Sequence, residues 1–177
     1  MGTVKRQDAL YYVVLIGLMF VLPIGFAWHD ISNWIIEFDP PFKDRFLKLW
    51  VPRLDAAFVL WAVGVRLVLE GVRRIIGPRS AALVIAGPLT DEALPVVRQL
   101  GFACVAIGCP AIFLSYSNPF ASECIGLIAG VFYLFSGAAQ LLHKRSGRKQ
   151  DVTMLCELTC GLVLLVFWGI LRSVYFM

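Results

Sequence analysis

The chain has 177 residues, of which 59% are hydrophobic and 16% are charged, and its mean hydropathy is +0.79. A soluble domain usually carries about 25% charged residues, and a single soluble core of this length would not bury so much apolar side chain. The net charge of +4 comes from basic clusters between apolar runs and not from a basic face on a soluble module, which argues against nucleic-acid binding. The composition therefore predicts an all-α, polytopic membrane bundle formed by one transmembrane domain, residues 1–177.

The first apolar run, residues 9–28, follows a short basic start. A run of roughly 20 apolar residues is long enough for a helix to cross a bilayer. A cleaved secretory signal is the alternative, since Gly25 and Ala27 fit a small-x-small cleavage pattern. The run is longer than a usual signal core and the bulky Trp28 would follow the cut, so we expect a retained membrane anchor.

Residues 30–50 separate the first two apolar runs, and two stretches within them carry apolar stripes at helical spacing. Asp30 or Ser32 is suited to cap the first of these helices, and Pro40 follows its end. We expect two amphipathic helices lying flat in the headgroup region, and the alternative is a docking surface for a partner outside the cytoplasm. The stripes consist of Ile31, Trp34, Ile35 and Phe38 in the first stretch and of Phe42, Phe46, Leu49 and Trp50 in the second.

The second predicted span, residues 54–76, carries charged residues well inside its length. Arg66 and Glu70 are four residues apart, so they are able to pair along one helix face. Ion pairs in membrane helices are costly and usually face protein or water rather than lipid. Gly64 and Gly71 are seven residues apart and predict a thin stripe for close contact with another helix.

The third and fourth predicted spans, residues 96–116 and 121–142, are joined by a short turn. Ser122, Gly126 and Gly130 follow one another at four-residue spacing, which is the small-xxx-small pattern of closely packed membrane helices. The pattern indicates packing without naming the partner. This ridge is therefore suited either to a neighbouring helix of the same chain or to another subunit.

The fifth predicted span, residues 152–172, follows the most basic loop of the chain. With five spans and the amino terminus inside, three basic clusters lie on the cytoplasmic side and hold nine Lys or Arg, against four in residues 29–53. This bias favours a multi-pass protein of the bacterial cytoplasmic (inner) membrane with a cytoplasmic amino terminus. A four-span arrangement, in which one helix does not cross, is the alternative.

This topology places several polar residues near the cytoplasmic leaflet, with Arg66 and Glu157 at matching depth and Glu70, Arg98 and Gln140 shallower. At a rise of about 1.5 Å per residue, Arg66 lies roughly 10 Å and Glu157 roughly 9 Å inside the bilayer, so we expect Arg66 to bridge Glu70 and Glu157. An ion pair that orients the helices is the favoured interpretation, and a proton or ion relay is the alternative. The predicted cluster consists of Arg66, Glu70, Arg98, Gln140 and Glu157, while Asp55 and Glu123 are candidate acids near the outer ends of their spans.

No catalytic, cofactor-binding or metal-binding pattern stands out in the sequence. The two histidines, His29 and His143, are predicted on opposite sides of the membrane, which leaves bis-histidine haem ligation unsupported. Glycine-rich phosphate loops, GxSxG and HExxH are all absent. The five cysteines lie in or beside apolar spans and are interpreted as small buried hydrophobes. We therefore expect a protein that is not an enzyme and holds no cofactor or metal.

Two functions are compatible with these features. The favoured hypothesis is a small non-catalytic subunit that scaffolds a larger bacterial envelope complex, such as a secretion, transport or respiratory assembly. The alternative is a small oligomeric transporter or channel that uses the intramembrane Arg/Glu cluster. A membrane enzyme acting on lipid or quinone has the least support. The expected partners are the lipid bilayer and either other membrane subunits or further copies of this chain.

Overall fold

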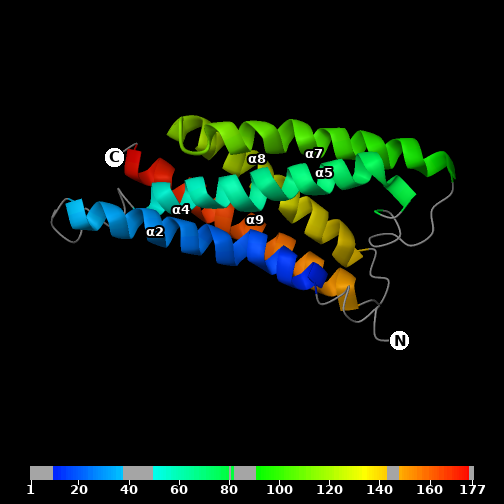
Figure 1. Ribbon diagram of the computed structural model, residues 1–177, viewed down its shortest axis with the longest axis horizontal. Coiled ribbons are helices and arrows are strands. Elements are labelled where there is room, and N and C mark those ends of the chain that lie inside the picture. The colour runs from blue at the N-terminus through cyan, green and yellow to red at the C-terminus, as the bar shows by residue number, and fades with distance from the viewer. Residues whose placement is uncertain (1–9, 38–49, 80, 82–90, 143–147, 176–177) are drawn as a thin grey trace.

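The computed structural model of the protein describes residues 10–37, 50–79, 81, 91–142 and 148–175 (Figure 1). Within these ranges every regular element is a helix. The prediction of an all-α protein is therefore confirmed for the described part of the chain. The longest apolar runs become its longest helices, because a helix satisfies its backbone hydrogen bonds internally where lipid offers no partner.

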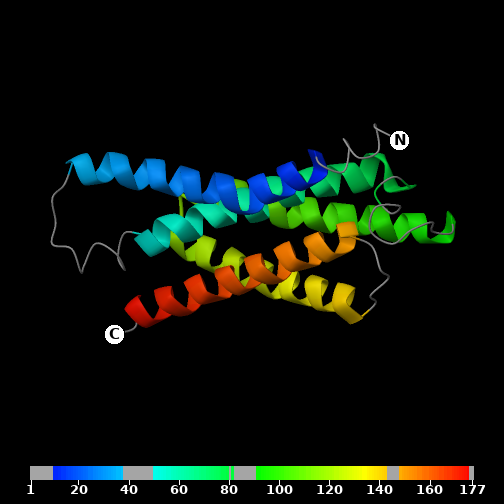
Figure 2. The ribbon, with the colours of Figure 1, turned by 90° about the horizontal axis from the view of Figure 1, so that it is seen from below.

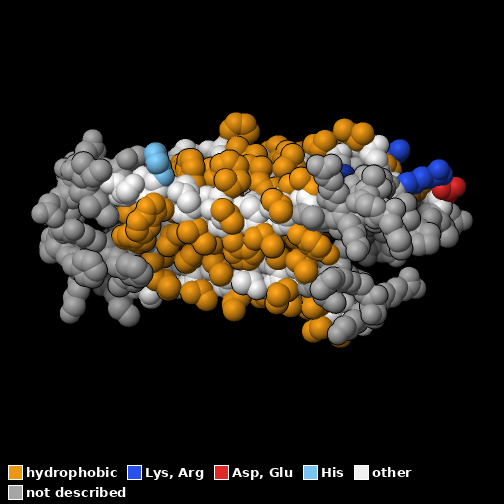
Figure 3. All heavy atoms as spheres, turned by 60° about the horizontal axis from the view of Figure 1, so that its bottom comes forward, with side chains coloured by type: hydrophobic (Ala, Val, Ile, Leu, Met, Phe, Trp, Pro, Cys, Tyr) orange, Lys and Arg blue, Asp and Glu red, His pale blue; other side chains and the backbone are white. Residues whose placement is uncertain are grey.

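Four helices of the described part are long and apolar enough to cross a membrane. They match the first, third, fourth and fifth predicted spans to within a few residues at each end, as expected for a multi-pass membrane protein. On the face shown in Figure 3, hydrophobic side chains form a broad belt over the middle of the bundle, and the Lys, Arg, Asp and Glu side chains drawn in blue and red gather at one end. The four apolar segments are Leu10–Ser32, Leu94–Leu114 (α7), Pro119–Leu142 (α8) and Val152–Ser173, the last lying within α9 (Arg148–Tyr175).

The first helix continues beyond its predicted end. A π-helical turn, η1 (Gly17–Val21), leads into α2 (Leu22–Glu37) without a break. The predicted cap at Asp30 or Ser32 is therefore wrong, and no separate helix starts there. The physical reason is that no Gly or Pro interrupts the chain between Gly25 and Glu37. Residues 38–49, which include most of the second predicted interfacial stretch, lie outside the described residues.

The second helix consists of α4 (Val51–Phe58), the π-helical segment η3 (Val59–Val65) and α5 (Arg66–Ile76). It is not one of the four strongly apolar helices. It nevertheless contacts the first helix, α7, α8 and α9. It also supplies several side chains of the main buried core, namely Phe58, Val59, Ala62, Val63 and Leu67. This helix is therefore the centre of the bundle. Its neighbours shelter the polar side chains that lower its hydropathy.

Glycines allow the helices to approach one another closely. A Cβ atom on Gly71 would lie 2.6 Å from the carbonyl oxygen of Gly101 in α7, and one on Gly64 would lie 2.8 Å from the Ile112 side chain. In α8, a Cβ on Gly130 would lie 3.2 Å from a backbone oxygen of α9. The small-residue ridges predicted on the second and fourth spans thus pack against helices of the same chain.

Successive helices run in opposite directions (Figures 1 and 2). The carboxyl ends of α5 and α8 therefore lie at the same end of the bundle as the amino ends of α7 and α9. The opposite end holds the start of α4, the α7–α8 turn and the end of α9. Figure 2 shows α8 and α9 side by side as a hairpin beneath the central helix, and the contacts between these elements agree. Polar side chains that are far apart in sequence meet at these two ends.

Candidate functional site

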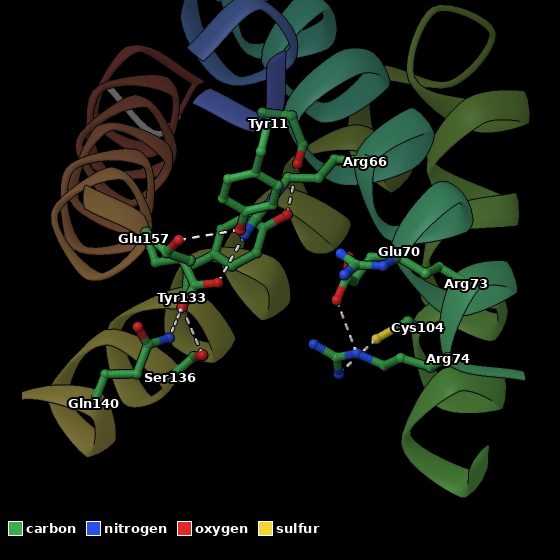
Figure 4. Close-up of polar contacts among 12 residues, drawn as sticks. Tyr11, Arg66, Glu70, Arg73, Arg74, Cys104, Tyr133, Ser136, Gln140 and Glu157 are labelled. Carbon is green, nitrogen blue, oxygen red and sulfur yellow. Dashed lines mark hydrogen bonds and ion pairs between the residues drawn. The ribbon is translucent and has the colours of Figure 1, made fainter. Parts of the chain in front are cut away.

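A buried ion pair joins the central helix to α9. The guanidinium Nη2 of Arg66 in α5 lies 2.7 Å from Oε1 of Glu157 in α9, and the two side chains are 11% and 10% exposed. Two α8 side chains donate to the other carboxylate oxygen: Ser136 Oγ at 2.6 Å and Gln140 Nε2 at 2.8 Å. Both oxygens of Glu157 are thus hydrogen-bonded, and three helices are held together at one point (Figure 4). We call Arg66, Ser136, Gln140 and Glu157 the inner clamp.

Tyr133 connects the inner clamp to the centre of the second helix. The Arg66 guanidinium carbon lies 4.8 Å from the centroid of the Tyr133 ring, which is a cation–π distance. The Tyr133 hydroxyl donates to the carbonyl oxygen of Ala62 in η3 at 2.5 Å. The fully buried Tyr133 therefore fixes both the backbone of the π-helical segment and the position of the Arg66 side chain.

Glu70 belongs to a separate group of charges. It lies 3.1 Å from Arg74 Nε and 3.7 Å from Arg73 Nη1, one turn further along the same helix. The predicted bridge from Arg66 to both carboxylates is therefore wrong: Arg66 pairs with Glu157, and Glu70 pairs with the arginines that follow it. A glutamate preceding a base by three or four residues is the favourable order on a helix. Figure 4 shows the two groups apart from each other.

The remaining residues of the predicted cluster divide in two. Gln140 lies in the inner clamp, as its hydrogen bond to Glu157 shows. Arg98 lies near the start of α7 with an exposed side chain, and it is not among the residues that contact Glu157 or Glu70. Gln140 lies in α8, which packs closely against α9, whereas the side chain of Arg98 lies on an exposed face of α7.

A second buried polar group lies at the opposite end of the bundle. The Ser122 hydroxyl of α8 donates to Oδ2 of Asp55 in α4 at 3.1 Å, and Arg172 Nε of α9 lies 3.9 Å from Oε2 of Glu123. Asp55 is 2% exposed and Glu123 is 7% exposed. We call Asp55, Ser122, Glu123 and Arg172 the outer cluster. The sequence indicated the two acids only as candidates near the outer ends of their spans, and it did not predict the partners Ser122 and Arg172.

The predicted interfacial residues are described only in part. Ile31 is buried against Ala27 and Ala57, with Trp50 packed at the edge of this small core. The rings of Trp28 and Trp50 meet edge to face with centroids 5.8 Å apart. The segment is therefore attached to the bundle at both of its described ends. Outside the described side chains lie Trp34, Ile35, Phe38, Phe42 and Phe46.

The fold and its two polar groups define a multi-pass helical bundle with paired charges in its interior. Among the described residues, no group of three or more His, Cys, Asp or Glu is arranged to hold a metal ion. Comparison with protein-family models, with curated proteins and with solved structures found no match for this chain. The contacts between helices in its two polar groups are ion pairs and hydrogen bonds.

Proposed function

We propose that the helix from Val51 to Ile76 is a fifth transmembrane span and that the amino terminus is cytoplasmic in a bacterial inner membrane. The central position of this helix supports the proposal, because its neighbours on several sides are helices apolar enough to cross. Its ionisable side chains Asp55 and Arg66 have partners on α8 and α9. The basic residues at its carboxyl end then face the cytoplasm, in keeping with the positive-inside bias.

We further propose that the protein is a small non-catalytic subunit that scaffolds a larger envelope complex. The observation that carries this proposal is the occupied carboxylate of Glu157, which accepts hydrogen bonds from Arg66, Ser136 and Gln140. A carboxylate in a proton or ion relay must exchange partners during each cycle. Glu157 is instead held by donors from two other helices, as expected of a group that sets helix register.

A scaffold needs a surface for its partner, and the glycine ridges are already used inside the chain. Gly71 packs on α7, and Gly130 packs on α9. This leaves the segment between α2 and α4 as the proposed docking surface, for two reasons. Its flanking residues Ile31 and Trp50 are attached to the bundle. Its sequence also carries the apolar stripe residues Phe42 and Phe46.

Copurification from native membranes tests the subunit proposal. The full chain, expressed at its native level and crosslinked before extraction, is expected to bring down a fixed set of membrane proteins. Phe42→Asp together with Phe46→Asp should remove that set, while the matched pair Phe42→Leu and Phe46→Leu should retain it. If the wild-type chain carries no fixed partner, or if the Asp pair retains all partners, the proposed scaffold role and docking surface are wrong.

A second candidate is a small oligomeric transporter or channel that uses Arg66, Glu70 and Glu157. One observation favours it: Nη1 of Arg66 is buried and has no hydrogen-bond partner among the described residues. A buried donor of this kind is costly unless something binds it. Purified protein in liposomes distinguishes the two candidates. Ion or proton flux that is lost in Glu157→Gln but kept in Glu70→Gln, with both variants folded, would favour transport over scaffolding.

A further inference from the structure

The two buried polar groups differ in their charge balance. In the inner clamp one guanidinium, Arg66, faces one carboxylate, Glu157. In the outer cluster Arg172 lies near Glu123, whereas the hydroxyl of Ser122 is the partner of the second carboxylate, Asp55. The inner clamp is therefore neutral as an ion pair, whereas the described side chains of the outer cluster hold one negative charge too many. Such a charge is strongly disfavoured in a buried site unless it is neutralised.

Neighbouring charged groups do not restore this balance. Arg53, on the same helix as Asp55, forms an ion pair with Asp30 of α2, so this pair contributes no net charge. His29 lies on α2 with an exposed side chain. From α8 and α9, the charged groups at this end are Glu123 and Arg172 themselves. The excess charge therefore persists when the described titratable groups of α2, α4, α8 and α9 are considered together.

One atom of the outer cluster shows where the neutralising group belongs. Oδ1 of Asp55 is buried and has no hydrogen-bond partner within the described part of the chain, while Oδ2 accepts from Ser122. A Cβ atom on Gly126 would lie only 3.3 Å from this oxygen, so Oδ1 lies against the backbone of α8. A calcium ion takes about 6–8 oxygen ligands and magnesium about six, and the close packing leaves little room for such a shell. A proton needs no additional space.

We propose that the outer cluster is a proton-binding site in which Asp55 is carried as the neutral carboxylic acid. The bound proton removes the excess negative charge and leaves Glu123 paired with Arg172. The Ser122 hydroxyl then still donates its hydrogen bond to Oδ2 of the Asp55 carboxyl group, without a change in the helix contact. Loss of the proton leaves Asp55 negatively charged between α4 and α8, in addition to the charge of Glu123. This second negative charge weakens the contact between the two helices. This proposal stands whether or not the protein is a scaffold subunit.

Infrared spectroscopy of the full chain in a maltoside detergent, which has no carbonyl group, tests the proposal. Carboxyl-labelled ¹³C-aspartate identifies aspartic acid bands without any substitution. At neutral pH the wild type is expected to show one protonated aspartic acid band, which Asp55→Asn removes. The matched control Asp91→Asn, at a carboxylate that is 80% exposed, should retain the band. Glu123→Gln should make the band disappear at a lower pH than in the wild type, because a neighbouring carboxylate then no longer opposes the ionisation of Asp55.

Three results would overturn the proposal. The first is a labelled wild type without a protonated aspartic acid band at neutral pH. The second is a carboxylate band that moves when sodium is withdrawn, since a sodium ion would then be the bound cation. The third is a change in the Asp55 band when Lys43, Arg45 or Lys48 is replaced by Gln, which would assign the compensating charge to residues 38–49. None of these results bears on copurification, so failure of this proposal is distinct from failure of the scaffold role.

Discussion

At the scale of single residues, partners on other helices decide what each buried charge does. Arg66 and Glu70 are close enough in sequence to pair, yet Arg66 contacts Glu157 and Glu70 contacts Arg74. Arg66 also packs over the ring of Tyr133, which adds a cation–π contact on the bundle side of its helix. The buried carboxylate and aromatic ring together outweigh the local pairing, which is worth only about 0.2–0.5 kcal/mol along a helix.

Tyr133→Phe tests the link between the π-helical segment and the inner clamp. The change keeps the ring under Arg66 and removes only the hydroxyl that donates to Ala62. The free energy of unfolding should fall by about 1 kcal/mol, because the hydrogen bond from the hydroxyl to the Ala62 carbonyl is lost. Denaturation in mixed micelles measures the difference. Tyr116→Phe, at a partly exposed tyrosine, should change it by less than about 0.5 kcal/mol, and equal effects in both variants would contradict the assignment.

The stability of the outer cluster should depend on pH in one direction. In the folded state Asp55 is proposed to bind a proton, whereas an aspartate in the unfolded chain is ionised above about pH 4. Folding then takes up a proton, so the free energy of unfolding falls as the pH rises, until the folded site has also lost its proton. Thermal melting between mildly acidic and mildly basic pH should show that the stability of the wild type falls with pH more steeply than that of Asp55→Asn. Equal dependence of stability on pH in the two proteins would contradict proton binding at Asp55.

At the scale of elements, close backbone contact joins the central helix to α7. Gly71 and Gly101 meet so closely that a Cβ on either would lie within 2.8 Å of the other's carbonyl oxygen. The repeat of small residues predicted a close contact for this face, and the structure shows that α7 is the neighbouring helix. The continuation of the first helix to Glu37 was not predictable in the same way, because an apolar stripe looks alike in a separate flat helix and in an extended span.

Gly71→Ala tests this contact against a matched glycine. The added methyl group forces α5 and α7 apart, and overpacking of this kind costs about 1–3 kcal/mol. Gly169→Ala in α9 has nothing within 4 Å of the new atom, and it should raise stability by about 0.5–1 kcal/mol through helix propensity. The same unfolding measurement serves both variants. An unchanged free energy of unfolding in Gly71→Ala would show that α5 and α7 are not in close contact there.

At the scale of the whole molecule, most of the fold follows from hydropathy, while the composition of the candidate site does not. Four apolar runs became four long apolar helices because length and composition dictate them. Helix rise also gave the matching depth of Arg66 and Glu157. Depth does not give the direction in which a side chain points, however. Arg98 was therefore grouped with residues that it does not contact, and the meeting of Asp55 with Ser122 required the packed helices.

The five-span topology predicts which positions are accessible from outside the cell. In a chain with its native cysteines replaced by alanine, an impermeant maleimide added to intact cells should label Ser117→Cys. Thr3→Cys and Ser146→Cys should react only after the membrane is opened. If the helix from Val51 to Ile76 did not cross, Thr3 and Ser117 would be on the same side of the membrane. Equal labelling of these two positions would therefore contradict five spans.

The central claim is that Arg66 and Glu157 form a structural clamp between helices, and a double-mutant cycle tests it most directly. Glu157→Leu alone should lower the free energy of unfolding by about 3–5 kcal/mol, because it leaves the Arg66 charge buried without its partner. Adding Arg66→Met should recover part of that loss, because the uncompensated charge is removed while Ser136 and Gln140 stay without their acceptor. Additive losses from the two single variants, or a loss below about 1 kcal/mol in Glu157→Leu, would contradict the claim.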